Sequence, residues 1–124
     1  MVNDLIGVPF KQHGRDKSGM DCLGLAIEVL KREGIKLDDV FYDDLEEATK
    51  KRLMESMEAS VPSARLESPE KNCVIEFNIL GQPSHIGVYL GCGEFIHASE
   101  QFGVVIDKLY RWKHKVRGYY RVNH

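Results

Sequence analysis

The sequence has no large excess of either charge and no long apolar run. Its 17 lysines and arginines are dispersed among 19 acidic residues, and the formal net charge is -2. Electrostatic binding of nucleic acid needs a basic face, so we expect no nucleic acid partner. No apolar stretch approaches the ~18 residues of a membrane-spanning helix, so no membrane contact is expected. Met1–Leu5 lack the pattern of an export signal, which predicts a protein that is cytoplasmic as synthesised.

Cysteine is also scarce, with Cys22, Cys73 and Cys92 widely spaced along the chain. An odd number of cysteines without an export signal argues against a disulfide framework, so we expect free thiols. No C-x2-C or H-x3-H pair accompanies the five histidines, which disfavours a structural zinc site. The 124 residues, 43% of them hydrophobic, fit one globular domain over residues 1–124.

An amphipathic helix is expected between Asp21 and Gly34. Apolar side chains recur at helical spacing, at Leu23, Ile27 and Leu30. Asp21 can cap this helix, which places Cys22 in the first turn, where unpaired N–H groups favour an anion. Gly24 costs about 1 kcal/mol relative to alanine in a helix, so we expect another element to approach closely there. A second, more charged helix is predicted over about Asp44–Glu58, followed by a loop over residues 59–72.

From Cys73 onward the apolar period changes to two, which predicts strands. The expected strands cover residues 73–77, 85–90, 94–97, 104–108 and 118–122, with a hairpin turn at Gly91-Cys92-Gly93. If Leu90 pairs with Glu94, Gly87 lies opposite His97 and the rings of His85 and His97 become diagonal neighbours. The predicted fold class is α+β, with the first helix packed on an antiparallel sheet and the helices gathered on one side.

The residues Cys22, His85 and His97 form a candidate catalytic set. A thiol at a helix N-terminus beside a histidine is favoured as the reactive thiolate. Taken alone, a cysteine at a helix position is more often a small buried hydrophobe, and it is the flanking Asp21 and Gly24 that favour a nucleophile here. Gly87 leaves space beside the His85 ring, into which we expect the helix end to pack. His97 can then hydrogen-bond the far nitrogen of His85 and fix its tautomer.

Four motifs in a fixed order carry a family resemblance. They are Gly7-Val8-Pro9-Phe10, Asp21-Cys22-Leu23-Gly24-Leu25, Ser84 to Gly91, and Phe95-Ile96-His97-Ala98. Together, from Leu5 to about Val122, they resemble the NlpC-type cysteine peptidases, compact papain-like endopeptidases that cut bacterial cell-wall peptides. The resemblance implies that Cys22 is the nucleophile, His85 the general base and acid, and His97 the residue that orients His85.

The resemblance also implies a substrate and a reaction. The substrate is the peptidoglycan stem peptide, with the γ-D-glutamyl to diamino acid bond as the favoured amide, cut through a thioester without a metal or organic cofactor. The implied substrate-binding residues are Phe10, Gln12, Asp21 and Ser84, with Asp21 holding the polar end of the peptide.

Two positions depart from the family pattern. Phe10 replaces a tyrosine whose hydroxyl assists the oxyanion hole, which leaves the Cys22 N–H and Gln12 as donors. Loss of one donor costs ~10²-fold or more in rate. Leu23 replaces a common serine and, with the short length and the Trp112–Arg121 ending, makes the chain most similar to signal-less members encoded with phage tails. That similarity implies phage tail proteins as partners and a virion-associated or released location.

Two alternatives to the hydrolase remain open on the sequence. The chain can be a weakly active or non-catalytic peptidoglycan-binding or virion component that keeps the fold, which Phe10 favours. It can also be an acyltransferase, because an acceptor other than water can intercept a thioester.

Overall fold

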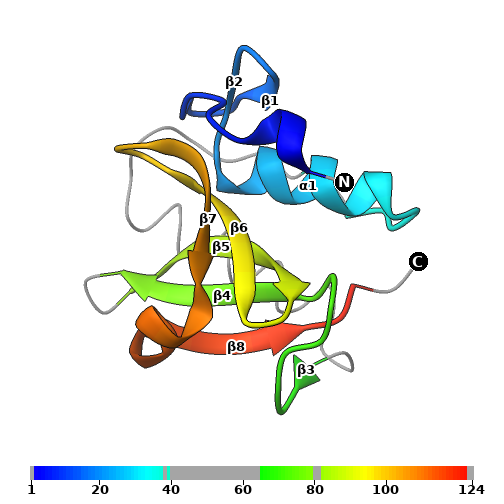
Figure 1. The fold of residues 1–124 in the computed structure, drawn as a ribbon, viewed down its shortest axis with the longest axis vertical. Coiled ribbons are helices and arrows are strands. Elements are labelled where there is room, and N and C mark those ends of the chain that lie inside the picture. Colours follow the sequence, from blue (N-terminus) through cyan, green and yellow to red (C-terminus); the bar gives the residue numbers. More distant parts are fainter. Residues whose placement is uncertain (1, 38, 40–64, 80–81, 123–124) are drawn as a thin grey trace.

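The computed structural model describes residues 2–37, 39, 65–79 and 82–122. Within these residues, one α-helix packs on a six-stranded antiparallel sheet, as Figure 1 shows, which confirms the predicted α+β class. The predicted helix over Asp44–Glu58 lies outside the described residues. In chain order the elements are η1 (Asn3–Leu5), β1 (Arg15–Asp16), β2 (Gly19–Met20), α1 (Cys22–Arg32), β3 (Arg65–Leu66), β4 (Val74–Ile79), β5 (Gln82–Gly91), β6 (Glu94–Ser99), β7 (Gly103–Lys108), η3 (Leu109–Arg111), η4 (Lys113–Lys115) and β8 (Val116–Tyr120), where η denotes a 3₁₀ helix.

Helix α1 begins and ends where the sequence predicts. The Asp21 side chain caps it by accepting a hydrogen bond from the Gly24 N–H at 2.8 Å. Gly34 adopts the left-handed conformation with φ +76°, which suits a residue without a Cβ and ends the helix. The Ile35 N–H then donates to the Leu30 carbonyl at 2.9 Å. Cys22 is therefore the first helical residue.

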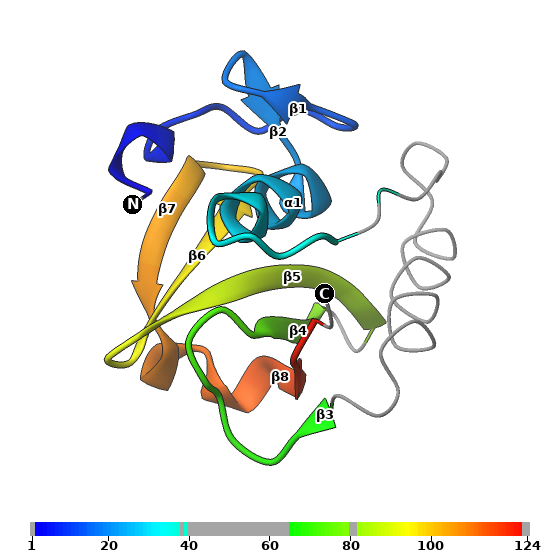
Figure 2. The same ribbon diagram turned by 90° about the vertical axis from the view of Figure 1, so that its right-hand side faces the viewer.

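The sheet has the strand order β3-β8-β4-β5-β6-β7 and buries side chains on both faces. Helix α1 lies across β5 and β6, which Figure 2 shows from the side. The face beneath α1 carries Ile86, Val88, Ile96, Ala98 and Val104. The opposite face carries Ile75, Phe77, Phe95 and Tyr119, with Leu109 and Trp112 packed against them. The predicted alternation along the strands is confirmed.

The β5–β6 hairpin differs from the prediction at its tip. Val88 pairs with Ile96, which places Gly87 opposite His97 as expected. Gly91, however, pairs with Glu94, because a bulge between Tyr89 and Gly91 takes up one residue of β5. The turn is therefore two residues long, Cys92 and Gly93, with φ values of 54° and 80°.

Other boundaries shift by a few residues. β8 runs from Val116 to Tyr120, two residues earlier than predicted at each end. β6 extends to Ser99, and β3 forms inside the predicted loop by pairing with β8. The short strands β1 and β2, which the sequence analysis did not predict, pair just before α1.

The three cysteines are free thiols in three different environments. Cys22 is half-buried, Cys73 is buried and Cys92 is exposed. Burial raises the pKa of the Cys73 thiol to about 11. Among the helices that the structure describes, none has the length and apolar character needed to cross a membrane.

Candidate active site

Two histidines on neighbouring strands contact each other. Nε2 of His85 on β5 lies 2.8 Å from Nδ1 of His97 on β6, within hydrogen-bond distance. The antiparallel register puts the two side chains on one face of the sheet as diagonal neighbours. The sequence-predicted contact between these two rings is therefore present.

A carboxylate that the sequence analysis missed contacts the second nitrogen of His97. Oδ2 of Asp107 on β7 lies 2.7 Å from Nε2 of His97. Phe95 pairs with Asp107 and His97 pairs with Val105, so Asp107 is a diagonal neighbour of His97 on the same face. Alternation along the predicted strand over residues 104–108 indicates which side chains share a face with Asp107, but finding its neighbour His97 also requires the β6–β7 register.

Burial sets the charge state of His97. The residue is 2% exposed, and desolvation lowers the pKa of its imidazole below 6.5 even though Asp107 opposes the shift. At pH 7 the neutral ring is therefore the dominant form. A neutral imidazole has one N–H donor and one acceptor nitrogen, so its two partners must differ in kind.

Aromatic side chains surround the histidine pair. The ring of Trp112 lies 5.0 Å from His97 in an edge-on arrangement and 6.3 Å from His85 in a stacked one. Phe95 lies 4.7 Å from His97, and Phe77 lies 5.7 Å from His85. These contacts limit rotation of both rings, and they bury His97 while His85 stays half-buried. Trp112 was not predicted as a site residue.

The expected role of Gly87 is wrong. A Cβ at this position would lie 3.0 Å from the Phe95 ring and 3.3 Å from Cβ of His97. The Ile96 carbonyl, Phe95 and His97 therefore fill the space directly above Gly87, which we expected to be open. Along its length, helix α1 packs on the face of β5 that carries Ile86 and Val88. Gly87 serves the histidine pair by letting Phe95 and His97 approach closely.

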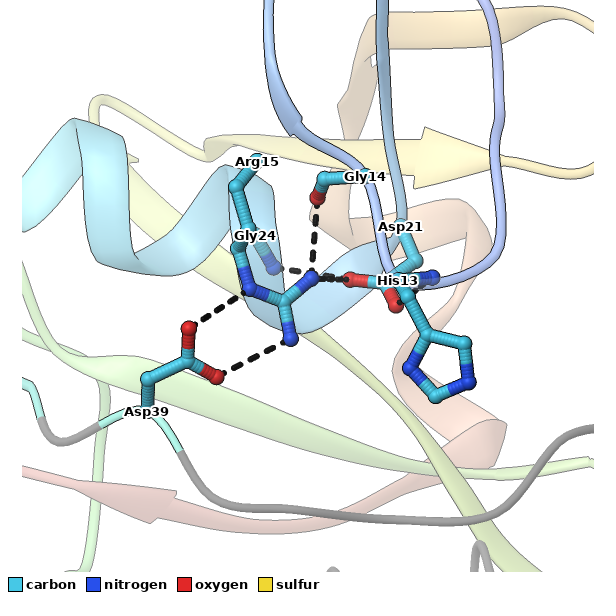
Figure 3. Close-up of polar contacts among 6 residues, drawn as sticks. All are labelled: His13, Gly14, Arg15, Asp21, Gly24 and Asp39. Carbon is cyan, nitrogen blue, oxygen red and sulfur yellow. Dashed lines mark hydrogen bonds and ion pairs between the residues drawn. The ribbon is translucent and has the colours of Figure 1, made fainter.

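Asp21, the neighbour of Cys22, is 3% exposed and is held by three N–H donors (Figure 3). Its Oδ1 accepts from the Gly24 N–H at 2.8 Å and from Nη1 of Arg15 at 2.9 Å. Its Oδ2 accepts from the His13 N–H at 2.8 Å. The carboxylate thus joins the start of α1 to the segment before it. Its binding of the stem peptide stays a prediction.

Arg15 extends this network to Asp39. Its Nε and Nη2 bind the two carboxylate oxygens of Asp39 at 2.9 and 3.0 Å, as Figure 3 shows. This pairing lowers the pKa of the Asp39 carboxyl and raises that of the Arg15 guanidinium, against the opposing effect of burial. The sequence analysis missed both residues, because a single arginine in a two-residue strand has no recognisable pattern.

The prediction that another element approaches Gly24 is confirmed. A Cβ on Gly24 would fall on the carbonyl oxygen of Gly14 and lie 3.1 Å from Nη1 of Arg15. The same carbonyl accepts a hydrogen bond from Arg15 at 2.8 Å. Gly24 therefore lets the preceding segment lie directly against the first turn of α1.

The remaining predicted site residues lie on that segment and on β5. Phe10 is half-buried, forms a β-bridge with Met20 and packs against the core beneath α1. Gln12 is half-buried in a turn that the Gly14 N–H closes on the Lys11 carbonyl at 2.8 Å. Ser84 precedes His85 on β5, and its side chain is not among those that the structure describes.

Cys22 lies in the first turn of α1 and packs against the core between that helix and the sheet. Helix α1 contacts both β5 and β6, the strands that carry the two histidines. Residues 7–121 match the model of the NlpC/P60 family. The chain belongs to the NlpC/P60 family. Its members are cysteine peptidases that hydrolyse peptidoglycan, in agreement with the resemblance given by the four motifs.

Relatives in this family include enzymes of the bacterial wall. The chain is 27% identical over 107 residues to the murein DD-endopeptidase MepS/murein LD-carboxypeptidase of Escherichia coli strain K12. That match covers 86% of this chain and 50% of that protein, so the chain spans about half the length of the curated relatives it matches.

Solved structures of NlpC/P60 domains share the fold. The NlpC/p60 domain of the peptidoglycan hydrolase SagA superimposes with a TM-score of 0.67 at 19% identity, covering 96% of this chain and 91% of that one. NlpC1 from Trichomonas vaginalis superimposes with a TM-score of 0.72 at 19% identity, covering 98% of this chain and 41% of that one. At these identities the likeness concerns the fold alone.

Proposed function

We propose that this NlpC/P60 protein hydrolyses an amide bond in the stem peptide of peptidoglycan. The observation that carries the proposal is the hydrogen-bonded pair His85–His97 on the two strands against which the helix of Cys22 packs. The relatives named as a murein endopeptidase and a peptidoglycan hydrolase support the substrate class.

In the proposed reaction, His85 takes the thiol proton of Cys22. The thiolate attacks the carbonyl carbon, and the Cys22 N–H stabilises the oxyanion. The C–N bond then breaks as the His85 imidazolium gives its proton to the leaving amine, which leaves a thioester. Water attacks the thioester while His85 accepts a proton from it, the C–S bond breaks to release the carboxylic acid, and the His85 imidazolium returns the proton to the Cys22 thiolate.

The resemblance and the relative point to different target bonds. The sequence resemblance favours the γ-D-glutamyl to diamino acid bond, whereas the Escherichia coli relative is named a DD-endopeptidase and LD-carboxypeptidase. Mass spectrometry of muropeptides digested with the protein separates them. The favoured cut leaves a muramyl dipeptide, whereas cleavage of a DD cross-link converts dimers into monomers with longer stems. Cys22→Ala is the control. Equal products from both proteins would refute the proposal.

A non-catalytic wall-binding protein is the second candidate, and Phe10 is the observation that favours it. A phenyl ring cannot donate to an oxyanion, so this chain lacks the hydroxyl that the sequence resemblance implies at this position. Binding of the intact protein to purified wall sacculi, together with no release of soluble fragments, would establish this reading. An acyltransferase would instead yield a new amide when an amine acceptor is supplied with the stem peptide.

We also propose an association with phage tails and a location in the virion or outside the cell. Leu23 and the Trp112–Arg121 segment support it. Sedimentation of the protein with purified tail particles is the test.

A further inference from the structure

Three side chains form a hydrogen-bonded chain across three adjacent strands. Asp107 on β7 contacts Nε2 of His97 at 2.7 Å. His97 on β6 contacts Nε2 of His85 on β5 through its Nδ1 at 2.8 Å. The first contact lies outside the roles that the sequence resemblance assigns, which end at His97.

The chemistry of the three side chains determines which group donates and which accepts in each of these two hydrogen bonds. An ionised carboxylate only accepts hydrogen bonds, so Nε2 of His97 is protonated and donates a hydrogen bond to Asp107. Because burial keeps the His97 ring neutral, its Nδ1 then holds a lone pair and accepts from Nε2–H of His85. A neutral His85 with its proton on Nε2 has its lone pair on Nδ1. That nitrogen is the one able to take a proton from a thiol.

His97 by itself cannot set the direction of these hydrogen bonds. With Nδ1–H of His97 donating to Nε2 of His85, the pair keeps its hydrogen bond but runs in reverse. His85 then carries its proton on Nδ1 and has no basic nitrogen left for Cys22. A fixed acceptor beyond His97 removes the reversed arrangement, because Nε2 of His97 would face Asp107 with a lone pair.

We propose that Asp107 is a positioning residue that sets the tautomer of His97 and, through it, the tautomer of His85. Phe95 and Trp112 pack on the His97 ring, so the ring cannot turn to satisfy a different partner. The effect on turnover rests on the proposed hydrolase function, whereas the tautomers can be observed without any substrate.

The test compares Asp107→Asn with Glu94→Gln in the full chain. Asparagine keeps the shape of Asp107 but also offers an N–H₂ donor to His97. Glu94 is the matched control, because it is a carboxylate of the same β6–β7 hairpin that pairs with Lys108 at 2.8 Å instead of a histidine. Ring ¹⁵N shifts of the two histidines report the protonated nitrogen, and circular dichroism checks the fold.

We expect Nε2–H on His85 and His97 in the wild type and in Glu94→Gln. In Asp107→Asn we expect a shift of both rings towards Nδ1–H, and a fall of about 10- to 100-fold in kcat on a stem peptide with KM nearly unchanged, the range seen for partners that orient ligand histidines. Asp107→Ala, which removes the acceptor without adding a donor, should give a mixture of tautomers and a smaller loss.

A double-mutant cycle separates an effect of Asp107 that acts through His97 from a general structural effect. If Asp107 acts through His97, Asp107→Asn has no further effect on Cys22 alkylation in a His97→Ala background. Unchanged tautomers in Asp107→Asn, or equal losses in both backgrounds, would overturn the proposal. A wild type that cleaves no stem peptide would refute the hydrolase function but leave the tautomer result to decide the role of Asp107.

Discussion

Nη1 of Arg15 lies 2.9 Å from Oδ1 of Asp21, the carboxylate that caps the helix of Cys22. The Asp21 side chain is 5% exposed, so removing the guanidinium leaves a buried charge with fewer donors. We expect Arg15→Ala to lower the free energy of unfolding by about 2 kcal/mol in urea titrations. Arg121→Ala removes an exposed pair with Glu70 and should cost less than about 1 kcal/mol. Equal losses in the two variants would show that burial of Asp21 does not strengthen its pairing with Arg15.

Gly24→Ala should destabilise the protein, whereas replacing glycine by alanine within a helix usually stabilises it. In an unobstructed helix this change stabilises by about 1 kcal/mol. Here the new methyl group meets the Gly14 carbonyl, so we expect a loss of roughly 1–3 kcal/mol by thermal or urea unfolding. Lys31→Ala, at an exposed position of the same helix, should change the value by less than about 0.5 kcal/mol. A stabilised Gly24→Ala would contradict the observed contact.

The three thiols should react in a fixed order. Below pH 7, iodoacetamide should modify Cys22 first, because it combines a helix N-terminus with a proposed histidine partner. Cys92 is exposed but lies in a turn, and Cys73 is buried with a pKa raised to about 11. Peptide mapping by mass spectrometry gives the order, and His85→Ala should slow only the labelling of Cys22. Equal labelling of Cys22 and Cys92 would remove the case for an activated thiol.

Phe10→Tyr should raise kcat if the oxyanion hole lacks a donor. A hydroxyl at this position gains up to ~10²-fold when it points correctly, while KM changes little. Steady-state kinetics on a stem peptide measures both. Gln12→Ala is the companion variant: if it abolishes turnover and Phe10→Tyr changes nothing, Gln12 is the donor and the hole is intact.

Cys73 should make stability fall at alkaline pH. Burial raises its folded-state pKa from 9.0 to about 11, so the unfolded chain loses this proton first. The contribution is fully present below pH 9 and is lost as the pH rises towards 11, by about 2–3 kcal/mol in total. Urea unfolding of wild type and Cys73→Ala at pH 8 and pH 10.5 measures it. The wild type should lose more, and parallel losses would show that burial of Cys73 does not perturb its thiol.

Local patterns predicted the framework of the fold well. Asp21, Gly24 and Gly34 marked the start, the close contact and the end of α1, because caps and glycines act over a few residues. The alternation along β5 and β6 predicted which face carries His85 and His97. These features depend on spacing alone, which a single sequence displays.

Features that depend on register or on long-range packing escaped prediction. Asp107 required the β6–β7 register, and Arg15 required knowing that its segment lies against α1. Trp112 follows β7 in a 3₁₀ segment with no periodic signal, yet it packs on His97. The bulge before Gly91 shortened the predicted hairpin turn, because one extra residue in a strand leaves the polar and apolar alternation nearby unchanged.

The order of the elements has a consequence for the newly made chain. Cys22 precedes His85 by 63 residues, so at about 5–20 residues per second a ribosome adds the thiol roughly 3–13 s before it reaches the proposed base. Asp107 follows later still. An emerging chain, or a product that terminates before β5, therefore carries the thiol without its proposed proton acceptor. The proposed hydrolase activity therefore cannot begin until the strands that carry His85 and His97 have been translated and paired.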